Sequence, residues 1–275
     1  MTTKSVLLVP TDFTAAGDNA VHYAEQLAKI LQAKVHLLHI VGNDKEAAAA
    51  KSTLNEIATK LEAQNIETKT IVEKGSIFED IGRVAKAEEA EFIIMGTHGD
   101  KGMQKVFGSK AIKVITNSDT PFIVVHKKPV ATYGLKNIVI PLSMDQEVKQ
   151  TVYFATNLAK YFQSKIHILY VEETDAFFKT KIERNLAAAK AILEERGFEY
   201  ALKGVTNKNL VPNLVDYAAS VNADMIAFLN NHENFATYLG GSFEQSLIAN
   251  EKEIPVMVIN SLSAKLVSMM AHMMR

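Results

Sequence analysis

One stretch of the chain is rich in glycine, and its residues suit the binding of an anion. The stretch "MGTHGDKGMQKVFGSKA", residues 95–111, holds glycines at 96, 99, 102 and 108, although the whole 275-residue chain has only 13. Glycine lets the main chain approach a ligand closely, and the start of a helix offers free N–H groups with partial positive charge. A helix beginning near Gly108 and Ser109 adds a hydroxyl donor at the same point. This combination predicts a phosphate site.

A carboxylate is placed to act beside that loop. Asp12 directly follows the apolar run "VLLVP". In an open α/β sheet, ligands lie beyond the carboxyl ends of the strands, and a carboxylate there accepts hydrogen bonds from the amine or hydroxyl groups of a nucleoside. The structural alternative is that the glycines only turn the chain and Asp12 caps a helix starting near Ala15. The two common phosphate-loop patterns, G-x-x-x-x-G-K-[ST] and G-x-G-x-x-G after the first strand, are absent from the sequence.

The chain repeats itself, and the repeat indicates its architecture. "LLVPTDFTAAGDNAVHYAEQLAKILQAKVHLLHI" aligns with "IVIPLSMDQEVKQTVYFATNLAKYFQSKIHILYV", "AEFIIMGTHG" with "ADMIAFLNNH", and "TPFIVV" with "IPVMVI". Within each half, short β-branched runs alternate with longer amphipathic segments, which is typical of parallel strands joined by helical crossovers. The sequence therefore predicts two similar doubly wound α/β domains, at residues 1–131 and 132–275.

The expected elements follow from these patterns. Apolar runs predict strands covered on both faces, and Thr14 is expected to cap the first helix. In the first half we expect strands at 5–10, 35–41, 67–73, 92–96 and 122–126, and helices at 15–32, 45–63, 77–89 and 109–118. In the second half we expect strands near 137–142, 165–171, 198–206, 224–229 and 255–259.

Composition excludes several classes of function. Thirty basic and 31 acidic side chains leave a net charge of −1, so no general field attracts nucleic acid or an anionic membrane. The chain has no cysteine for a disulfide framework or a sulfur-rich zinc site. The apolar run Val6–Val9 is too short for a signal peptide, and no stretch is long enough to span a membrane. We therefore expect a soluble, cytoplasmic protein with no membrane or nucleic-acid partner.

The motifs resemble the universal stress protein family. "VPTDFT", "MGTHGDKGMQKVFGSKAIKVI" and "TPFIVV" carry the resemblance, which extends over both halves as a tandem pair. It implies a five-stranded parallel sheet in the order 3-2-1-4-5 in each half, and binding of ATP or a related adenine nucleotide, with or without Mg²⁺. Between Gly99 and Gly108 lie eight residues, one fewer than in the family's pattern. This difference leaves open a shorter nucleotide.

The resemblance also implies a set of ligand-binding residues. Asp12 and the main chain at Ile40 are expected near the adenosine, Gly96 near the ribose, and Gly99, Gly108 and Ser109 around the phosphates. His98 lies in the glycine loop, where a contact with phosphate and a turn role are both open. The whole expected set is Pro10, Thr11, Asp12, Ile40, Met95, Gly96, His98, Gly99, Gly108 and Ser109.

The second half lacks most of these residues. Asp12 aligns with Ser143, Gly96 with Leu229, and Gly99 with His232. We therefore expect a degenerate second site, and the comparison favours a ligand role for Gly96 and Gly99. The cluster "NNH", residues 230–232, leaves open a different small ligand. His36 and His39 are three residues apart on one strand, so they face opposite sides, cannot share a metal and are interpreted as structural.

These features predict a nucleotide-binding regulator or stress-response factor with one nucleotide per chain, and not an enzyme. A weak ATP hydrolase or phosphotransferase is the first alternative, although no general base is evident. The second is a ligand-free interaction scaffold, favoured if the short loop has lost its phosphate geometry. The two halves are expected to pack as a pseudo-dimer through "FIVV" and "VMVI". A homodimer of two chains stays open.

Overall fold

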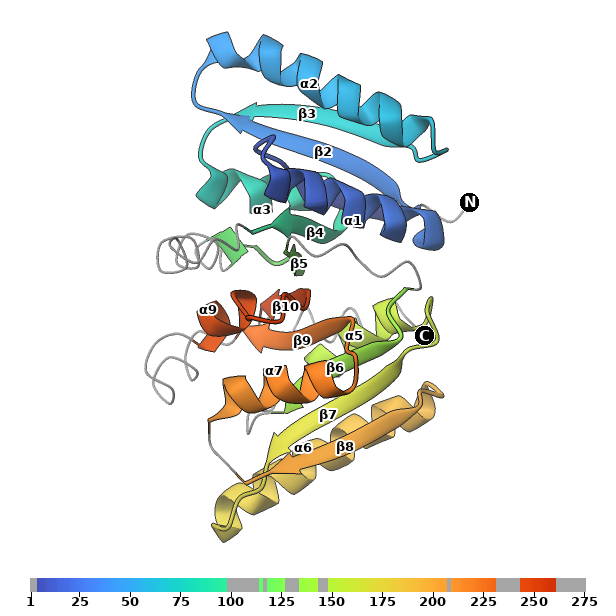
Figure 1. Cartoon of the computed structure of the whole chain (residues 1–275), viewed down its shortest axis with the longest axis vertical. Coiled ribbons are helices and arrows are strands. Elements are labelled where there is room, and N and C mark those ends of the chain that lie inside the picture. The colour runs from blue at the N-terminus through green and yellow to red at the C-terminus, as the bar shows by residue number, and fades with distance from the viewer. Residues whose placement is uncertain are drawn as a thin grey trace. The chain divides into compact units, whose positions relative to one another are not determined.

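The chain folds as two compact units. The computed structural model describes residues 4–97, 114–115, 118–126, 134–142, 148–206, 209–230 and 243–260. The units comprise Met1–Val130 and Ala131–Arg275 (Figure 1). Along the described ranges, no helix is both long enough and apolar enough to cross a membrane.

The first unit is a five-stranded parallel sheet in the order β3-β2-β1-β4-β5. This is the fold class and strand order expected from the sequence, which are thereby confirmed. The predicted helix at 109–118 lies largely outside the described residues. Within this range Val114, Ile115 and Ser118 are described, and the first two are helical. The elements are β1 (Val6–Pro10), α1 (Ala15–Leu31), β2 (Lys34–Val41), α2 (Asp44–Glu62), β3 (Thr68–Lys74), α3 (Ile77–Ala87), β4 (Ala90–Gly96) and β5 (Phe122–Val125).

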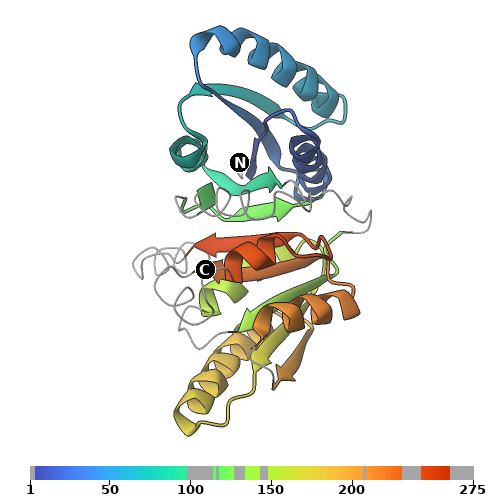
Figure 2. The ribbon, with the colours of Figure 1, turned by 60° about the vertical axis from the view of Figure 1, so that its left-hand side comes forward.

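Helices cover both faces of this sheet. Figure 2 shows α1 and α3 on opposite sides of the strands, and α2 lies along the edge strand β3. Strands β1 and β5 are almost wholly buried, which explains why "VLLV" and "FIVV" are continuous apolar runs and do not alternate. As predicted, Thr14 caps α1: its hydroxyl accepts a hydrogen bond from Gly17 N at 3.5 Å. Burial and capping thus account for where these elements lie.

The second unit repeats the same order of elements. Its parallel sheet runs β10-β9-β6-β7-β8, which corresponds strand for strand to the first. The strands of both units begin and end within two residues of the predicted positions. The elements are β6 (Asn137–Leu142), α5 (Val148–Ala159), β7 (Lys165–Val171), α6 (Ala176–Glu195), β8 (Tyr200–Val205), α7 (Leu210–Ser220), β9 (Met225–Asn230), α9 (Phe243–Ile248) and β10 (Val256–Asn260).

Each unit buries a polar pair where its last two strands end. In the first unit, Thr97 Oγ1 lies 3.3 Å from Nδ1 of His126, which is only 4% exposed. In the second, Asn230 Nδ2 donates to Asn260 Oδ1 at 2.7 Å. Burial lowers the pKa of His126 to about 4, because the charged imidazolium loses its hydration. His126 is therefore neutral in the native protein at physiological pH.

This neutral histidine predicts that the protein loses stability in mild acid. The unfolded chain takes up the proton below a pKa of about 6.5, whereas the folded chain does so only near 4. Stability is thus lost as the pH falls from about 6.5 to 4, by about 3 kcal/mol over the whole window. His126→Asn, which copies Asn260 of the second unit, should flatten this slope in urea unfolding measured at several pH values.

The exposed His22 supplies the matched control for this prediction. His22→Asn removes a histidine whose side chain is 52% exposed, so it should leave the slope unchanged. Burial also lowers the pKa of His36 and His167, so part of the slope should persist in every variant. An unchanged slope in His126→Asn would contradict the prediction.

Candidate functional site

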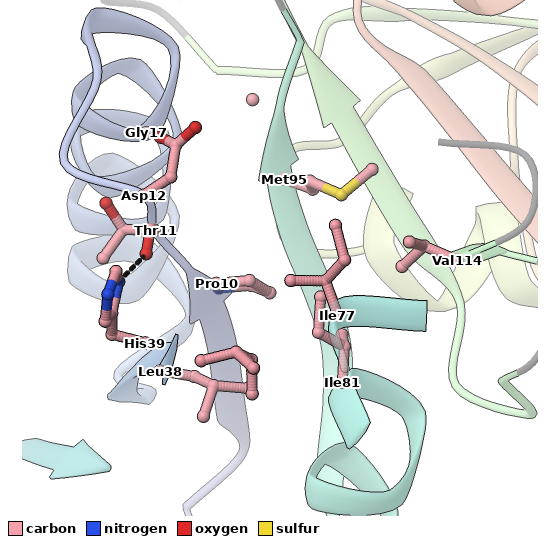
Figure 3. A pocket seen from close by; sticks show the side chains of 12 residues that line it. Pro10, Thr11, Asp12, Gly17, Leu38, His39, Ile77, Ile81, Met95 and Val114 are labelled. Carbon is pink, nitrogen blue, oxygen red and sulfur yellow. Dashed lines mark hydrogen bonds between the residues drawn. The ribbon is translucent and has the colours of Figure 1, made fainter. Parts of the chain in front are cut away.

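A pocket lies at the carboxyl edge of the first sheet. Its volume is about 150 Å³, and it opens where β1, β2 and β4 end, next to the start of α3. Figure 3 shows polar side chains along one side of it and aliphatic side chains along the other. The lining residues are Pro10, Thr11, Asp12, Gly17, Leu38, His39, Ile40, Ile77, Ile81, Met95, Gly96 and Val114.

Six residues that the sequence singled out meet in this one pocket. They come from three strand ends: Pro10 on β1 with Thr11 and Asp12 directly after it, Ile40 on β2, and Met95 and Gly96 on β4. Parallel strands bring their carboxyl ends to one edge of the sheet, so residues distant in sequence become neighbours there. The other expected ligand-binding residues, His98, Gly99, Gly108 and Ser109, lie outside the described residues.

Asp12 supplies the carboxylate of the polar side. Its Oδ1 accepts hydrogen bonds from the hydroxyl of Thr14 at 2.6 Å and from the Thr14 N–H at 3.1 Å. These contacts hold the side chain against the start of α1, while the cap of that helix is Thr14 itself. Within the described part of the chain, Oδ2 accepts no hydrogen bond. One carboxylate oxygen is therefore positioned by the protein, and the second can accept a hydrogen bond from a ligand.

Two isoleucines of α3 form much of the aliphatic side, and the sequence did not point to them. Ile81 is buried, whereas Ile77 is 45% exposed at the mouth of the pocket (Figure 3). An exposed isoleucine beside buried aliphatic groups is a surface on which a flat apolar ring can pack. The only signal in the sequence was the amphipathic spacing of 77–89, which does not show that this helix reaches the strand ends.

The first turn of α3 is anchored by ionic and main-chain contacts. Asp80 Oδ2 accepts from the Ser76 N–H at 2.8 Å, and Arg83 donates to both Asp80 Oδ1 and Glu73 Oε2 at 2.9 Å. The Ser76 N–H, and then the Arg83 guanidinium, hold the pKa of the Asp80 carboxyl below its ordinary value. A Cβ on Gly75 would overlap this carboxylate, so a larger residue there would displace the Asp80 side chain from its contacts. The aliphatic side of the pocket therefore rests on a fixed helix start.

Two glycines allow α1 to lie unusually close to the strand ends. A Cβ on Gly17 would come within 2.6 Å of Thr11 Oγ1, and one on Gly96 would overlap the main-chain carbonyl of Ala16. Gly96 is therefore required by packing whatever the pocket holds. The inference that Gly96 is kept for a ligand was incomplete, because the sequence could not show how near α1 approaches β4.

The second unit has different side chains at the matching positions. Val148 stands where the first unit has Gly17, and Leu229 where it has Gly96. Of the polar cluster expected from the sequence, Asn230 is buried and donates to Asn260, while residues 231 and 232 lie outside the described residues. Gln150 Nε2 donates to the Asn260 carbonyl at 2.9 Å. These amides are thus hydrogen-bonded within the unit.

The described residues offer no metal-binding cluster. Across the ranges that the structure covers, no group of three or more histidine, aspartate or glutamate side chains could hold a metal ion. The described lining of the pocket offers one carboxylate, the side chains of Thr11 and His39, and several aliphatic side chains.

Fold and pocket together define a class of protein: a parallel α/β domain with a pocket at the carboxyl edge of its sheet. Residues 5–126 match the model of the universal stress protein family. The chain therefore carries a universal stress protein domain in its first unit, and the resemblance drawn from the sequence is confirmed.

Similar proteins agree with this assignment. Universal stress protein MJ0577 of Methanocaldococcus jannaschii is 25% identical over 153 residues, which cover 44% of this chain and 94% of that protein. Universal stress protein MJ0531 of the same organism is 26% identical over 140 residues, covering 45% of this chain and 82% of that protein. A universal stress protein from Archaeoglobus fulgidus has the same fold over 93% of this chain and 98% of its own, with 18% identity and a TM-score of 0.76.

The packing of Gly96 predicts a stability effect that needs no ligand. Gly96→Ala places a Cβ against the main chain of Ala16, so we expect a loss of about 1–3 kcal/mol of unfolding free energy. Gly42→Ala is the matched control, because a Cβ there meets no atom nearer than 4.0 Å, and it should change stability by less than about 0.5 kcal/mol. Urea unfolding without nucleotide measures both; equal effects would contradict the close approach.

Proposed function

We propose that the first unit binds one adenine nucleotide, ATP or a related molecule, at the described pocket. The observation that carries this proposal is the convergence on one crevice of an Asp12 carboxylate oxygen that accepts no hydrogen bond from the described residues, the main chain of Ile40 and an aliphatic surface. Acceptors suit the amino group of the base and the hydroxyls of the ribose, while the aliphatic side chains suit the face of the base.

The size of the pocket supports binding of one part of a nucleotide there. Pockets that enclose a drug-sized ligand measure about 300–1,000 Å³, whereas this one measures about 150 Å³. The described walls therefore fit the adenosine portion. The phosphates would extend towards Gly99, Gly108 and Ser109, which follow β4 in the sequence and resemble the phosphate-binding residues of the family.

We assign the protein a regulatory or stress-response role without an enzymatic step. The family domain of the first unit supports this role, and the described lining of the pocket holds a single carboxylate, which we assign to binding the adenosine. The proposal includes a cytoplasmic location, a second unit without a nucleotide, and packing of the two halves as a pseudo-dimer. Weak hydrolysis of ATP is the competing function, because the glycine-rich stretch resembles a phosphate site.

Native mass spectrometry and calorimetry test the proposal on the full chain. With ATP and Mg²⁺, we expect a mass increase of one nucleotide per chain. Asp12→Ala should weaken binding roughly 10- to 100-fold, because it removes a charged hydrogen-bond acceptor. Asp18→Ala removes an equal charge from an exposed position in the first turn of α1 and should leave the dissociation constant unchanged. No binding at millimolar ATP would overturn the proposal.

Two further measurements separate the alternatives. Gly99→Val should abolish binding while the helical circular dichroism signal persists; an equal loss of helix would show that Gly99 serves folding. Steady release of phosphate that disappears in Gly99→Val would favour the hydrolase. A chain that binds no nucleotide yet keeps its native melting behaviour would favour the interaction scaffold.

A further inference from the structure

The loop that carries Asp12 contains a strained residue. Phe13 has a φ of +62°, in the left-handed region that bulky side chains rarely adopt. Such strain persists only where surrounding contacts hold it, and it is concentrated at functional sites. Phe13 lies between Asp12 and Thr14, the two residues whose side chains are joined by a hydrogen bond of 2.6 Å. The conformation of this loop therefore sets where the Asp12 carboxylate lies.

His39 contacts this loop from the neighbouring strand β2 in two ways. Its Nδ1 donates to the carbonyl oxygen of Thr11 at 2.8 Å. Its ring also stacks on Phe13, with centroids 4.3 Å apart and an angle of 22° between the planes. A carbonyl oxygen can only accept, so Nδ1 carries a proton and the neutral ring has its lone pair on Nε2. Figure 3 shows His39 bonded to Thr11 beside Asp12.

The second unit lacks this arrangement. Tyr170 stands on β7 where the first unit has His39 on β2, and Ser143 replaces Asp12 in the aligned sequence. A tyrosine ring can stack, but its hydroxyl lies further from the backbone than Nδ1 of a histidine. The histidine and the carboxylate thus occur together in the first unit and are both replaced in the second.

We propose that His39 is a positioning residue for the ligand site: it holds the Thr11–Thr14 loop in its strained form and thereby directs the Asp12 carboxylate towards the ligand. This inference rests on the proposed function and adds a residue to it that acts through Asp12. The hydrogen bond fixes the start of the loop at Thr11, and the ring contact fixes its turn at Phe13. Together they compensate for the strained backbone.

Two variants separate the contributions of His39. His39→Asn keeps an N–H donor near the position of Nδ1 but loses the ring, and His39→Phe keeps a ring for stacking but loses the donor. We expect each to raise the dissociation constant for ATP several-fold and His39→Ala to raise it about tenfold. His22→Asn, on the exposed side of α1, is the control and should bind as the unchanged chain does.

A double-mutant cycle with Asp12→Ala tests whether His39 acts through the carboxylate. In the Asp12→Ala background, His39→Ala should change ATP affinity less than about twofold. The same tenfold loss in both backgrounds would overturn the inference, because it would indicate a general effect on the fold. ¹⁵N NMR of the full chain should show His39 protonated at Nδ1 when neutral, and protonation at Nε2 alone would also overturn it.

Failure of this inference differs from failure of the proposed function. If the unchanged chain binds ATP and the His39 variants bind it equally well, only the positioning role is wrong. If the unchanged chain binds no ATP, the nucleotide site and the positioning role are wrong together.

Discussion

The pocket depends on the close approach of α1 to the ends of β1 and β4. Gly96 lies so near the carbonyl of Ala16 that no side chain fits between them, and a Cβ on Gly17 would come within 2.6 Å of the Thr11 hydroxyl. The first turn of α1 therefore packs against the ends of two neighbouring strands, β1 and β4. This contact places the loop that carries Asp12 across the pocket from Met95 on β4. A larger residue at either glycine would push the helix away from the crevice and with it the polar side of the pocket.

The second unit shows that the fold does not require this approach. It has the same strand order with Val148 and Leu229 at the two glycine positions. Where its last strands end, buried amides of Asn230 and Asn260 bond to each other. The first unit has Thr97 and His126 there, and the histidine stays neutral because it is buried. The two glycines thus allow α1 to approach the crevice of the first unit closely. The doubly wound fold itself does not need them.

Much of the fold could be predicted from the sequence, because apolar runs and amphipathic segments indicate which residues of each strand and helix are buried. Asp12 and Gly96 were found for a related reason: residues that follow parallel strands share one edge of the sheet. Ile77 was not found, because helical periodicity says which face of α3 is apolar but not how far the helix extends over the strand ends. His39 was interpreted as structural, since its contact with Phe13 depends on a left-handed backbone that the sequence does not reveal.

The polar and aliphatic sides of the pocket are held by separate contacts. The loop after β1 is held by His39 and Thr14, whereas α3 is held by Asp80, Arg83 and Gly75. No described hydrogen bond or ion pair joins these two groups of residues. The distance between the two sides is therefore set by the sheet beneath them, whose strands β2, β1 and β4 are neighbours. It follows that side chains on α3 can change the size of the aliphatic surface without moving the carboxylate, and that changes near His39 can alter the carboxylate without reshaping that surface.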